Sequence, residues 1–251
     1  MNIKNVLFQK IVNEAELLNA NFKIALVNPD IELIRASERA LKTNLAKFVA
    51  ISSQPINGIE TITVENPEEA ILKSLELVST GKVHTMAKGL VNTAQFLSKI
   101  ISSNFKVGYI THTSILEVPG FDNLFVVSDG TVTPKPNIEQ KIEIIKNSIH
   151  CARILGVKNP KVALLSANEL VLKDISSGHD AEQISKIAKN GLLDNGIIDG
   201  PMQLDSALSA EAMNRKKLHF SFNPPADVLI APDLESAALL IKSAVYFGRA
   251  L

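Results

Sequence analysis

Residues 24–41 read IALVNPDIELIRASERAL, and this stretch decides the class of fold. The apolar run 24–27 predicts a short buried strand. Asn28 can cap the helix that follows, and Pro29 suits its first turn. Apolar residues then recur at helical spacing, at Leu33, Ala36 and Ala40. A buried strand followed directly by a helix is typical of a parallel sheet with covering helices.

The same alternation continues along the chain. Further buried strands are expected at 48–51, 61–64, 83–86, 107–110, 124–127, 162–165, 196–198 and 228–230. Helices are expected at 68–79, from Asn92 onward, at 137–155 and at 234–247. We therefore predict an α/β protein with mostly parallel sheets flanked by helices, divided into two domains at 1–105 and 106–251.

Composition narrows the classes of partner. The 251 residues carry 26 basic and 26 acidic side chains, so no global field attracts a polyanion, which argues against a nucleic-acid partner. A small anionic ligand needs only a few local donors and stays possible. Cys151 is the only cysteine, which excludes an internal disulfide and fits a reducing compartment. No apolar run in residues 1–21 suits a signal peptide or membrane span, so we expect a cytoplasmic protein without a membrane partner.

Ligands of open parallel sheets collect at the carboxyl ends of strands, where helix N-termini point free amides outward. Five predicted turns there are unusually polar. They are Met86–Gly89 with Asn92 and Thr93, His112–Ser114, Ser128–Gly130, Asp199–Pro201, and Pro232–Asp233 with Glu235. We expect the ligand site among these turns.

The first turn has the features of an anion site. Gly89 allows close approach of the backbone to a ligand, Lys88 adds a positive charge, and Asn92 or Thr93 begins a helix. Gln95 stands at capping-box spacing from Asn92. The alternative interpretation is a surface lysine beside a capped helix. The glycine-rich fingerprints of P-loops and dinucleotide-binding folds are absent from the sequence.

His112 and Ser114 are spaced to share one side of an extended segment. No nucleophile elbow surrounds Ser114, so we expect hydrogen bonding, to a ligand or within a turn, rather than covalent catalysis. Lys242 lies in an apolar helix and extends either to water or into a cleft. No histidine pair has the spacing of a zinc site, so no metal is expected. The acids at strand ends either cap helices or contribute to the site; they are Asp129, Asp199, Asp205, Asp233 and Glu235.

Taken together and in this order, the turns resemble the phosphate acetyl/butyryltransferase family, and the butyryltransferase or branched-chain phosphotransacylase type more closely. The matching stretches are MAKGLVNTAQFL (86–97), THTSILEVPGFDNLFVVSDG (111–130), NPKVALLSANE (159–169), GIIDGPMQLDSAL (196–208) and ADVLIAPDLESAALLIKSAVYFG (226–248). They cover most of the chain after about residue 80.

The resemblance implies a two-domain fold related to isocitrate and isopropylmalate dehydrogenases, with the active site in the cleft between the domains. It implies reversible transfer of a short or branched acyl group between coenzyme A and inorganic phosphate. Coenzyme A, acyl-CoA and acyl phosphate would be substrates, with no tightly bound cofactor. The reactants would meet in a ternary complex without an acyl-enzyme, so orientation and charge stabilisation would carry catalysis. A homodimer or larger homo-oligomer is expected.

The resemblance also implies roles for individual residues. Those expected to hold phosphate or coenzyme A are Lys88, Gly89, Asn92 and Thr93. Those expected to act on the reacting groups are His112 and Ser114, facing the acyl carbonyl, and Lys242, approaching the phosphate or carbonyl oxygen from the second domain. Those expected to bind at or shape the cleft are Asp199, Gly200, Pro201, Pro232 and Glu235.

One departure from the family concerns the C-terminus. The family is expected to continue a few dozen residues beyond the helix at 234–247, with a Ser-Arg motif and an acid, whereas this sequence ends at Gly248-Arg249-Ala250-Leu251. A C-terminal segment is therefore expected to be missing. The sequence either is a piece of an ordinary enzyme or belongs to a non-catalytic acyl-CoA-binding paralogue. A dehydrogenase of the same fold is disfavoured, because no carboxylate cluster for a metal and no nicotinamide fingerprint is present.

Overall fold

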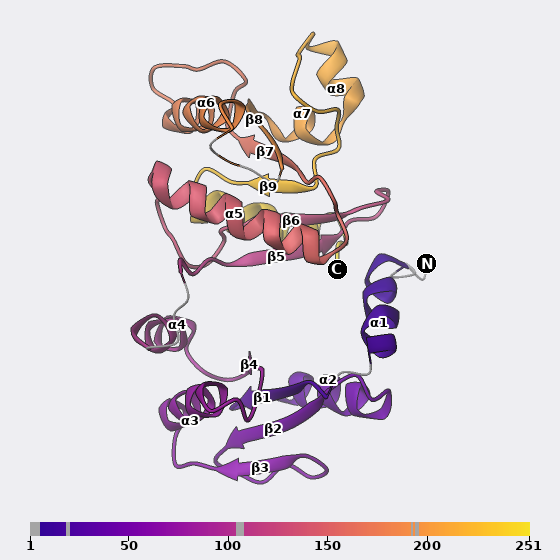
Figure 1. Ribbon diagram of the computed structural model, residues 1–251, viewed down its shortest axis with the longest axis vertical. Coiled ribbons are helices and arrows are strands. Elements are labelled where there is room, and N and C mark those ends of the chain that lie inside the picture. Colours follow the sequence, from indigo (N-terminus) through magenta and orange to yellow (C-terminus); the bar gives the residue numbers. More distant parts are fainter. Residues whose placement is uncertain (1–5, 19–20, 104–107, 192, 194–195) are drawn as a thin grey trace. The chain divides into compact units, whose positions relative to one another are not determined.

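The computed structural model describes residues 6–18, 21–103, 108–191, 193 and 196–251 (Figure 1). The chain divides into two compact units. The smaller unit is Gln9–Gly108, and the larger unit is Tyr109–Leu251 together with the chain up to Phe8. The predicted boundary between residues 105 and 106 lies outside the described residues. Each unit has its own sheet and its own core.

The smaller unit is built on a four-stranded parallel sheet in the order β3-β2-β1-β4. Its strands are β1 (Lys23–Val27), β2 (Lys47–Ser52), β3 (Glu60–Thr63) and β4 (Thr85–Lys88). Its helices are α2 (Ile31–Lys42), α3 (Pro67–Ser79) and α4 (Thr93–Ser102), and α1 (Val6–Leu18) begins in the larger unit and continues into this one. The parallel order confirms the alternation of strands and helices predicted from residues 24–41.

Helices cover both faces of this sheet because successive strand side chains point to opposite faces. Ala25 and Val27 pack in the cluster that contains residues of α3 and α4. Leu26, between them, packs in the cluster that contains Leu33 of α2. The fully apolar strand is thus explained by burial on both sides.

The larger unit has a five-stranded sheet in the order β5-β6-β9-β7-β8. Its strands are β5 (Thr113–Glu117), β6 (Leu124–Ser128), β7 (Lys161–Leu165), β8 (Ile197–Met202) and β9 (Val228–Ile230). The neighbouring pairs are parallel except β5 and β6, which are antiparallel. Its helices are α5 (Ile138–Ile154), α6 (Ser176–Lys189), α7 (Leu204–Leu208), α8 (Ala210–Arg215) and α9 (Leu234–Tyr246).

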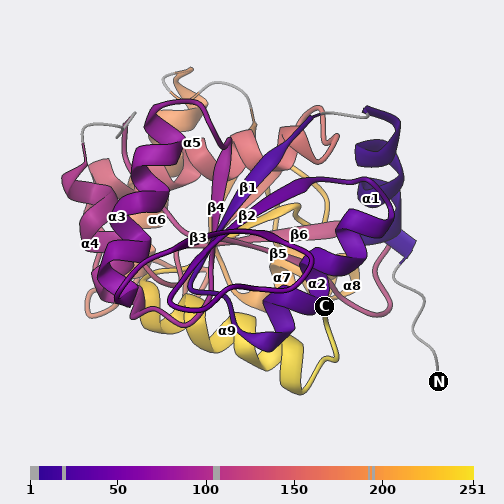
Figure 2. The same ribbon diagram turned by 90° about the horizontal axis from the view of Figure 1, so that it is seen from below.

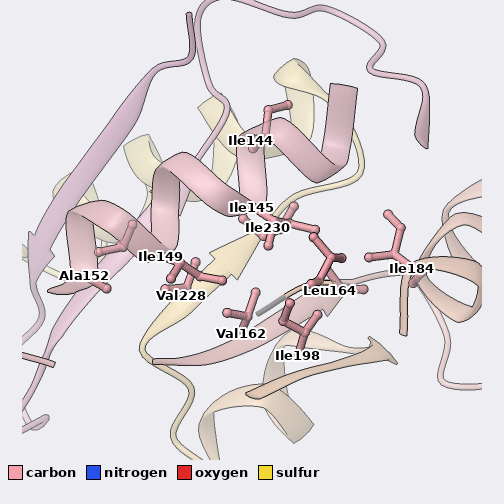
Figure 3. Close-up of a cluster of buried hydrophobic side chains, with 13 residues drawn as sticks. Ile144, Ile145, Ile149, Ala152, Val162, Leu164, Ile184, Ile198, Val228 and Ile230 are labelled. Atoms are coloured by element: carbon pink, nitrogen blue, oxygen red, sulfur yellow. The ribbon is translucent and has the colours of Figure 1, made fainter. Parts of the chain in front are cut away.

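Helices α5 and α9 lie on opposite faces of the five-stranded sheet (Figure 2). Val126 of β6 packs in the cluster that contains Ile145 and Ile149 of α5. Figure 3 shows these two α5 side chains beside Val228 and Ile230 of β9 in the same cluster. The residue after Val126, Val127, faces the other way and packs in the cluster that contains Leu240 of α9. Because α9 follows β9 directly, its first turn begins at the carboxyl edge of the sheet.

Two local predictions were wrong. The strand expected at 107–110 is not formed at 108–110, and residue 107 lies outside the described residues; the strand of this region is β5, at Thr113–Glu117. Asn28 does not cap α2; Asp30 does, accepting from the Leu33 amide at 2.7 Å. The strand β5 is at the edge of its sheet and pairs on one side only, so its sequence is more polar and predicts a strand less clearly than a fully apolar run does.

Among the described helices none combines the length and apolar composition needed to cross a bilayer.

Candidate functional site

The carboxyl edge of the smaller sheet brings the ends of β1 and β4 together, with Val27 paired to Lys88. The loops beyond these strands are tied by three hydrogen bonds. The Gly89 amide donates to Val27 O at 2.9 Å, the Leu90 amide to Asn28 O at 2.6 Å, and Asn28 Nδ2 to Leu90 O at 2.7 Å. Asn28 therefore joins two loops, a role that its position before a helix did not indicate.

Gly89 is required by packing within the protein. A Cβ placed on it would overlap Asn28 O and would lie 2.5 Å from Pro29 Cα. These are backbone atoms of a tied loop and cannot move aside cheaply. The sequence suggested that Gly89 lets the backbone approach a ligand, whereas the structure shows it approaching the loop after β1.

Lys88 and the first turn of α4 have hydrogen-bond donors that a ligand could use. Lys88 Nζ donates to Gly89 O at 3.1 Å and to Val91 O at 2.9 Å, and the side chain is exposed. An ammonium group has three donors, so one remains for an anion. Asn92 caps α4 by accepting from the Gln95 amide at 3.0 Å, as its spacing predicted. Its side-chain oxygen is thus occupied, while Thr93 in the first turn is exposed.

In the larger unit, three of the predicted turns meet at one edge of the sheet. Because β5 runs antiparallel to β6, its first residue, Thr113, pairs with Ser128 at the end of β6. Ser128 in turn pairs with Ile230 at the end of β9. Ser128 Oγ also donates to the His112 carbonyl at 2.6 Å. The structure thus brings His112–Ser114, Ser128–Gly130 and the start of α9 together.

The His112 ring lies against Gly130, which follows β6. A Cβ placed on Gly130 would lie 3.6 Å from His112 Nδ1, 3.5 Å from Ala238 N and 2.9 Å from Ile241 Cδ1, so Gly130 fits closely between the ring and α9. Burial lowers the pKa of His112 below its ordinary value, and the negative charge of Asp129 opposes this shift in part. The ring is therefore neutral at neutral pH.

Two carboxylates hold the loops around this site. Buried Asp129 accepts from the amides of Thr131 and Val132 at 2.9 Å each and of Thr133 at 3.2 Å. Asp233 caps α9 by accepting from the Ser236 amide at 2.8 Å. Both acids therefore serve as backbone caps, the alternative that the sequence left open.

The other predicted residues near this edge differ in exposure. Ser114 pairs with Val127 and shares a strand face with Leu116, whose side chain packs on the α9 side. Glu235 and Lys242 on α9 are exposed. Pro232 borders a space of about 10 Å³ that buried Lys141 also lines. Lys141 donates to half-buried Asp180 at 2.8 Å, an ion pair that no pattern in the sequence indicated.

Asp199, Gly200 and Pro201 do not form a turn at a strand end, and that prediction was wrong. They lie inside β8, whose pairing with β7 is irregular at this point. Asp199 accepts from the amide and hydroxyl of Ser221 at 2.7 Å each and pairs with Lys189 at 3.1 Å. Burial alone would raise the pKa of Asp199, but these bonds lower it overall. The aspartate therefore fastens the segment around Ser221 to the edge strand.

A second polar cluster explains two of the matching motifs. Lys216 Nζ donates to Glu169 at 2.8 Å, to Asp205 at 2.7 Å and to Gln203 Oε1 at 2.6 Å. These acceptors come from the stretches SANE and MQLDSA, which are distant in sequence. The motifs thus join the loop after β7 to α7 and α8. No local pattern connects them, so only the resemblance indicated their importance.

Metal ligation finds no support in the described residues. No group of three or more histidine, cysteine, aspartate or glutamate side chains is arranged there to hold an ion. The two carboxylates at the edge of the larger sheet, Asp129 and Asp233, are bonded to backbone amides. The groups at the two sheet edges that can donate to a ligand are the Lys88 ammonium, the amides of the α4 first turn and the His112 ring. Such groups bind anions and polarise carbonyl oxygens.

Comparison with known proteins identifies the family. Residues 6–251 match the family described as "Phosphate acetyl/butaryl transferase". The chain is 36% identical to a phosphate butyryltransferase of Clostridium acetobutylicum, covering 94% of this chain and 82% of that protein. It is 31% identical to a phosphate acetyltransferase of Rickettsia typhi, covering 91% and 70%.

A crystal structure of a branched-chain phosphotransacylase from Enterococcus faecalis V583 superposes with a TM-score of 0.81 at 24% identity, covering 91% of this chain and 86% of that one. At this identity the superposition shows a shared α/β fold. The family match extends over nearly the whole chain, and the sequence relatives agree with it. This chain therefore belongs to the phosphate acetyl/butyryltransferase family.

Proposed function

We propose that this protein is a phosphate acyltransferase that moves a short or branched acyl group reversibly between coenzyme A and inorganic phosphate. The observation that carries the proposal is the 36% identity over 94% of the chain with a phosphate butyryltransferase. That likeness also favours an enzyme over a non-catalytic acyl-CoA-binding paralogue. The substrates are acyl-CoA and phosphate in one direction, and acyl phosphate and coenzyme A in the other.

The reaction needs no group on the enzyme to be acylated. A phosphate oxygen attacks the thioester carbonyl carbon, an O–C bond forms, and the C–S bond breaks. The electron pair of the broken bond leaves with the coenzyme A sulfur, which is released as thiolate and takes a proton. The enzyme must hold two anionic reactants close together and stabilise the negative charge on the carbonyl oxygen.

The two sheet edges supply groups for these tasks. We assign phosphate binding to Lys88 and the first turn of α4 at Thr93, with Gly89 and Asn92 shaping that loop. His112 and Ser114 face the acyl carbonyl, and Lys242 approaches the phosphate or carbonyl oxygen. Asp199, Gly200, Pro201, Pro232 and Glu235 contribute to the form of the coenzyme A site. Coenzyme A acts as a substrate, with no tightly bound cofactor.

Lys88→Ala is expected to raise the KM for phosphate about tenfold or more, because a lost hydrogen bond to a charged group is worth about 1.5–3 kcal/mol. The matched control is Lys82→Ala, which removes an exposed lysine that precedes β4 at the opposite edge of the same sheet. Initial rates at varied phosphate concentration measure both variants. An unchanged phosphate KM in Lys88→Ala would remove this residue from the site.

Release of coenzyme A thiol from acetyl-, butyryl- and isobutyryl-CoA tests the function itself. The purified 251-residue protein is expected to release thiol only when phosphate is present and to form acyl phosphate in equal amount. The relative rates give the preferred acyl group. Binding of acyl-CoA without phosphate-dependent release would contradict the proposed function and support the non-catalytic alternative.

We further propose a cytoplasmic homodimer or larger homo-oligomer. Large apolar side chains lie exposed on α9, at Leu239 and Tyr246, and just beyond it, at Phe247. Exposed apolar surface of this kind favours association. Light scattering on the assayed preparation gives the mass of the assembly, and a monomeric mass would contradict the proposal.

A further inference from the structure

His112 has one ring nitrogen turned inward and one turned outward. Nδ1 is buried and has no hydrogen-bond partner among the described residues. Nε2 makes no hydrogen bond there either, and unlike Nδ1 it keeps some accessible surface on this half-buried side chain. The bond from Ser128 Oγ to the His112 carbonyl holds the backbone. Gly130, against which the ring lies, has no side chain that could offer Nδ1 a partner.

This burial decides which nitrogen carries the proton. A neutral imidazole has one N–H donor and one lone-pair acceptor. A proton on Nδ1 would be a buried donor without an acceptor. Buried N–H groups without a partner are rarer in proteins than buried acceptors without one. A proton on Nε2 can be given to water or to a substrate. The neutral ring therefore carries its proton on Nε2.

Nearby charges do not reverse this conclusion. The charged groups on the elements packed around the ring are Asp129 after β6, Asp233 and Glu235 at the start of α9, and Lys242 further along α9. Asp129 attracts a proton to the ring, yet burial outweighs it and the pKa of His112 is lowered. Asp129 itself is bonded to three backbone amides and makes no hydrogen bond to the ring.

We propose that His112 is a neutral hydrogen-bond donor whose Nε2–H binds the acyl carbonyl oxygen and stabilises the negative charge that develops there. This inference rests on the proposed function. A general base needs an accessible lone pair, and the only lone pair of this ring is on buried Nδ1. His112 therefore takes no proton from the thiol or from phosphate. A neutral imidazole can polarise a carbonyl in this way without proton transfer.

Three substitutions separate a donor from a base. The amide N–H of glutamine reaches the position of Nε2, whereas that of asparagine reaches the position of Nδ1. His112→Gln is expected to keep kcat within about tenfold of the original protein. His112→Asn and His112→Ala are expected to lower kcat by about 10²–10³, the cost of losing one oxyanion donor, with little change in the KM for acyl-CoA.

The pH profile gives an independent readout. Both the neutral and the protonated ring carry Nε2–H, so a donor works in either state and His112→Gln keeps the acid limb of the original kcat profile. A base would lose activity below its pKa, and glutamine would be as inactive as alanine. Equal loss in His112→Gln and His112→Ala overturns the proposal, and so does unchanged kcat in all three variants.

Nitrogen-15 NMR of the five histidines tests the protonation state without any assay. The signal absent from His112→Gln assigns the residue, and circular dichroism confirms that the variant is folded. We expect an unprotonated Nδ1, a protonated Nε2 and a titration below the ordinary pKa of about 6.5. A protonated Nδ1 at neutral pH overturns the proposal. Absence of phosphate-dependent release in the original protein overturns the proposed function instead, and the NMR result then still decides the state of His112.

Discussion

Replacing Ile145 with alanine lowers the free energy of unfolding of the larger unit by an expected 2–5 kcal/mol or so, the usual cost of a deep isoleucine truncation. Ile145 has 0% of its surface exposed. It lies on α5 in the cluster with Val228 and Ile230 of β9 (Figure 3), and the same cluster contains Val126. Removing three carbons there loses transfer free energy and leaves a cavity that the sheet cannot close.

Ile154→Ala is the matched control, because Ile154 ends the same helix and is 71% exposed. Its expected effect is within about 0.5 kcal/mol. Urea unfolding followed by tyrosine fluorescence measures both variants. The protein has no tryptophan, and its two tyrosines, Tyr109 and Tyr246, both lie in the larger unit, so the signal reports that unit alone. Similar midpoints for the two variants would contradict the assignment of α5 to the core.

Gly200→Ala is expected to destabilise the same unit by about 1–3 kcal/mol through overpacking. A Cβ at this position would lie 2.7 Å from Leu164 Cβ and 2.7 Å from Leu164 O. Both atoms belong to β7, the strand paired with β8, so the clash is relieved only by moving one strand from the other. The same fluorescence-detected urea titration gives the loss.

Gly178→Ala is expected to change the free energy of unfolding in the opposite direction. Gly178 lies in the first turn of α6, where a Cβ would make ordinary contacts, the nearest at 3.6 Å to Val171 Cα. Alanine restricts the unfolded chain, so we expect a gain of about 0.4–1 kcal/mol. If Gly200→Ala were as stable as Gly178→Ala, the close approach of β8 to β7 would be wrong.

Elements with strong local signals were predicted well. The helix expected at 137–155 is α5, Ile138–Ile154, and its N-cap and C-cap are Asn137 and Leu155, the first and last residues of the predicted range. Asn137 and Gln140 form a capping box, an arrangement complete within four residues of sequence. The strand expected at 228–230 is β9, which pairs on both sides and is fully buried. A strand that is buried on both faces needs an apolar residue at every position, so its sequence is an unbroken apolar run.

The two edge strands of the five-stranded sheet were predicted poorly, whereas β3 and β4, at the edges of the four-stranded sheet, lie within about two residues of the ranges expected for them. The strand β5 carries Thr113, Ser114 and Glu117 among its five residues, and among the described residues it pairs with one strand, β6. Buried Glu117 accepts from the Leu7 and Phe8 amides of α1, a contact between distant segments that no local pattern indicates. On the other edge, β8 continues through Gly200 and Pro201, residues that ordinarily mark a turn. Contacts with Leu164 and Ser221 hold this segment in the sheet. Neither partner is near it in sequence.

Several expectations taken from the family resemblance stay predictions. They are the division into domains at residue 105, the cleft between the domains, the likeness to isocitrate and isopropylmalate dehydrogenases, and the roles of the site residues. For Lys88 and Thr93 the structure supplies free donors, which supports the proposed phosphate role. For Gly89 it supplies a packing reason that is sufficient without a ligand.

Local sequence was sufficient to predict the alternation of buried strands and helices and the cap of α4, because each depends on residues a few positions apart. The family was predicted from long motifs in a fixed order. The burial of His112 Nδ1, in contrast, follows from how distant segments pack around the ring. That burial depends on Ser128, Gly130 and α9. Helix α9 lies more than a hundred residues from His112 along the chain. Burial and hydrogen bonding between distant segments set the protonation state of a side chain, and no spacing in the sequence records them.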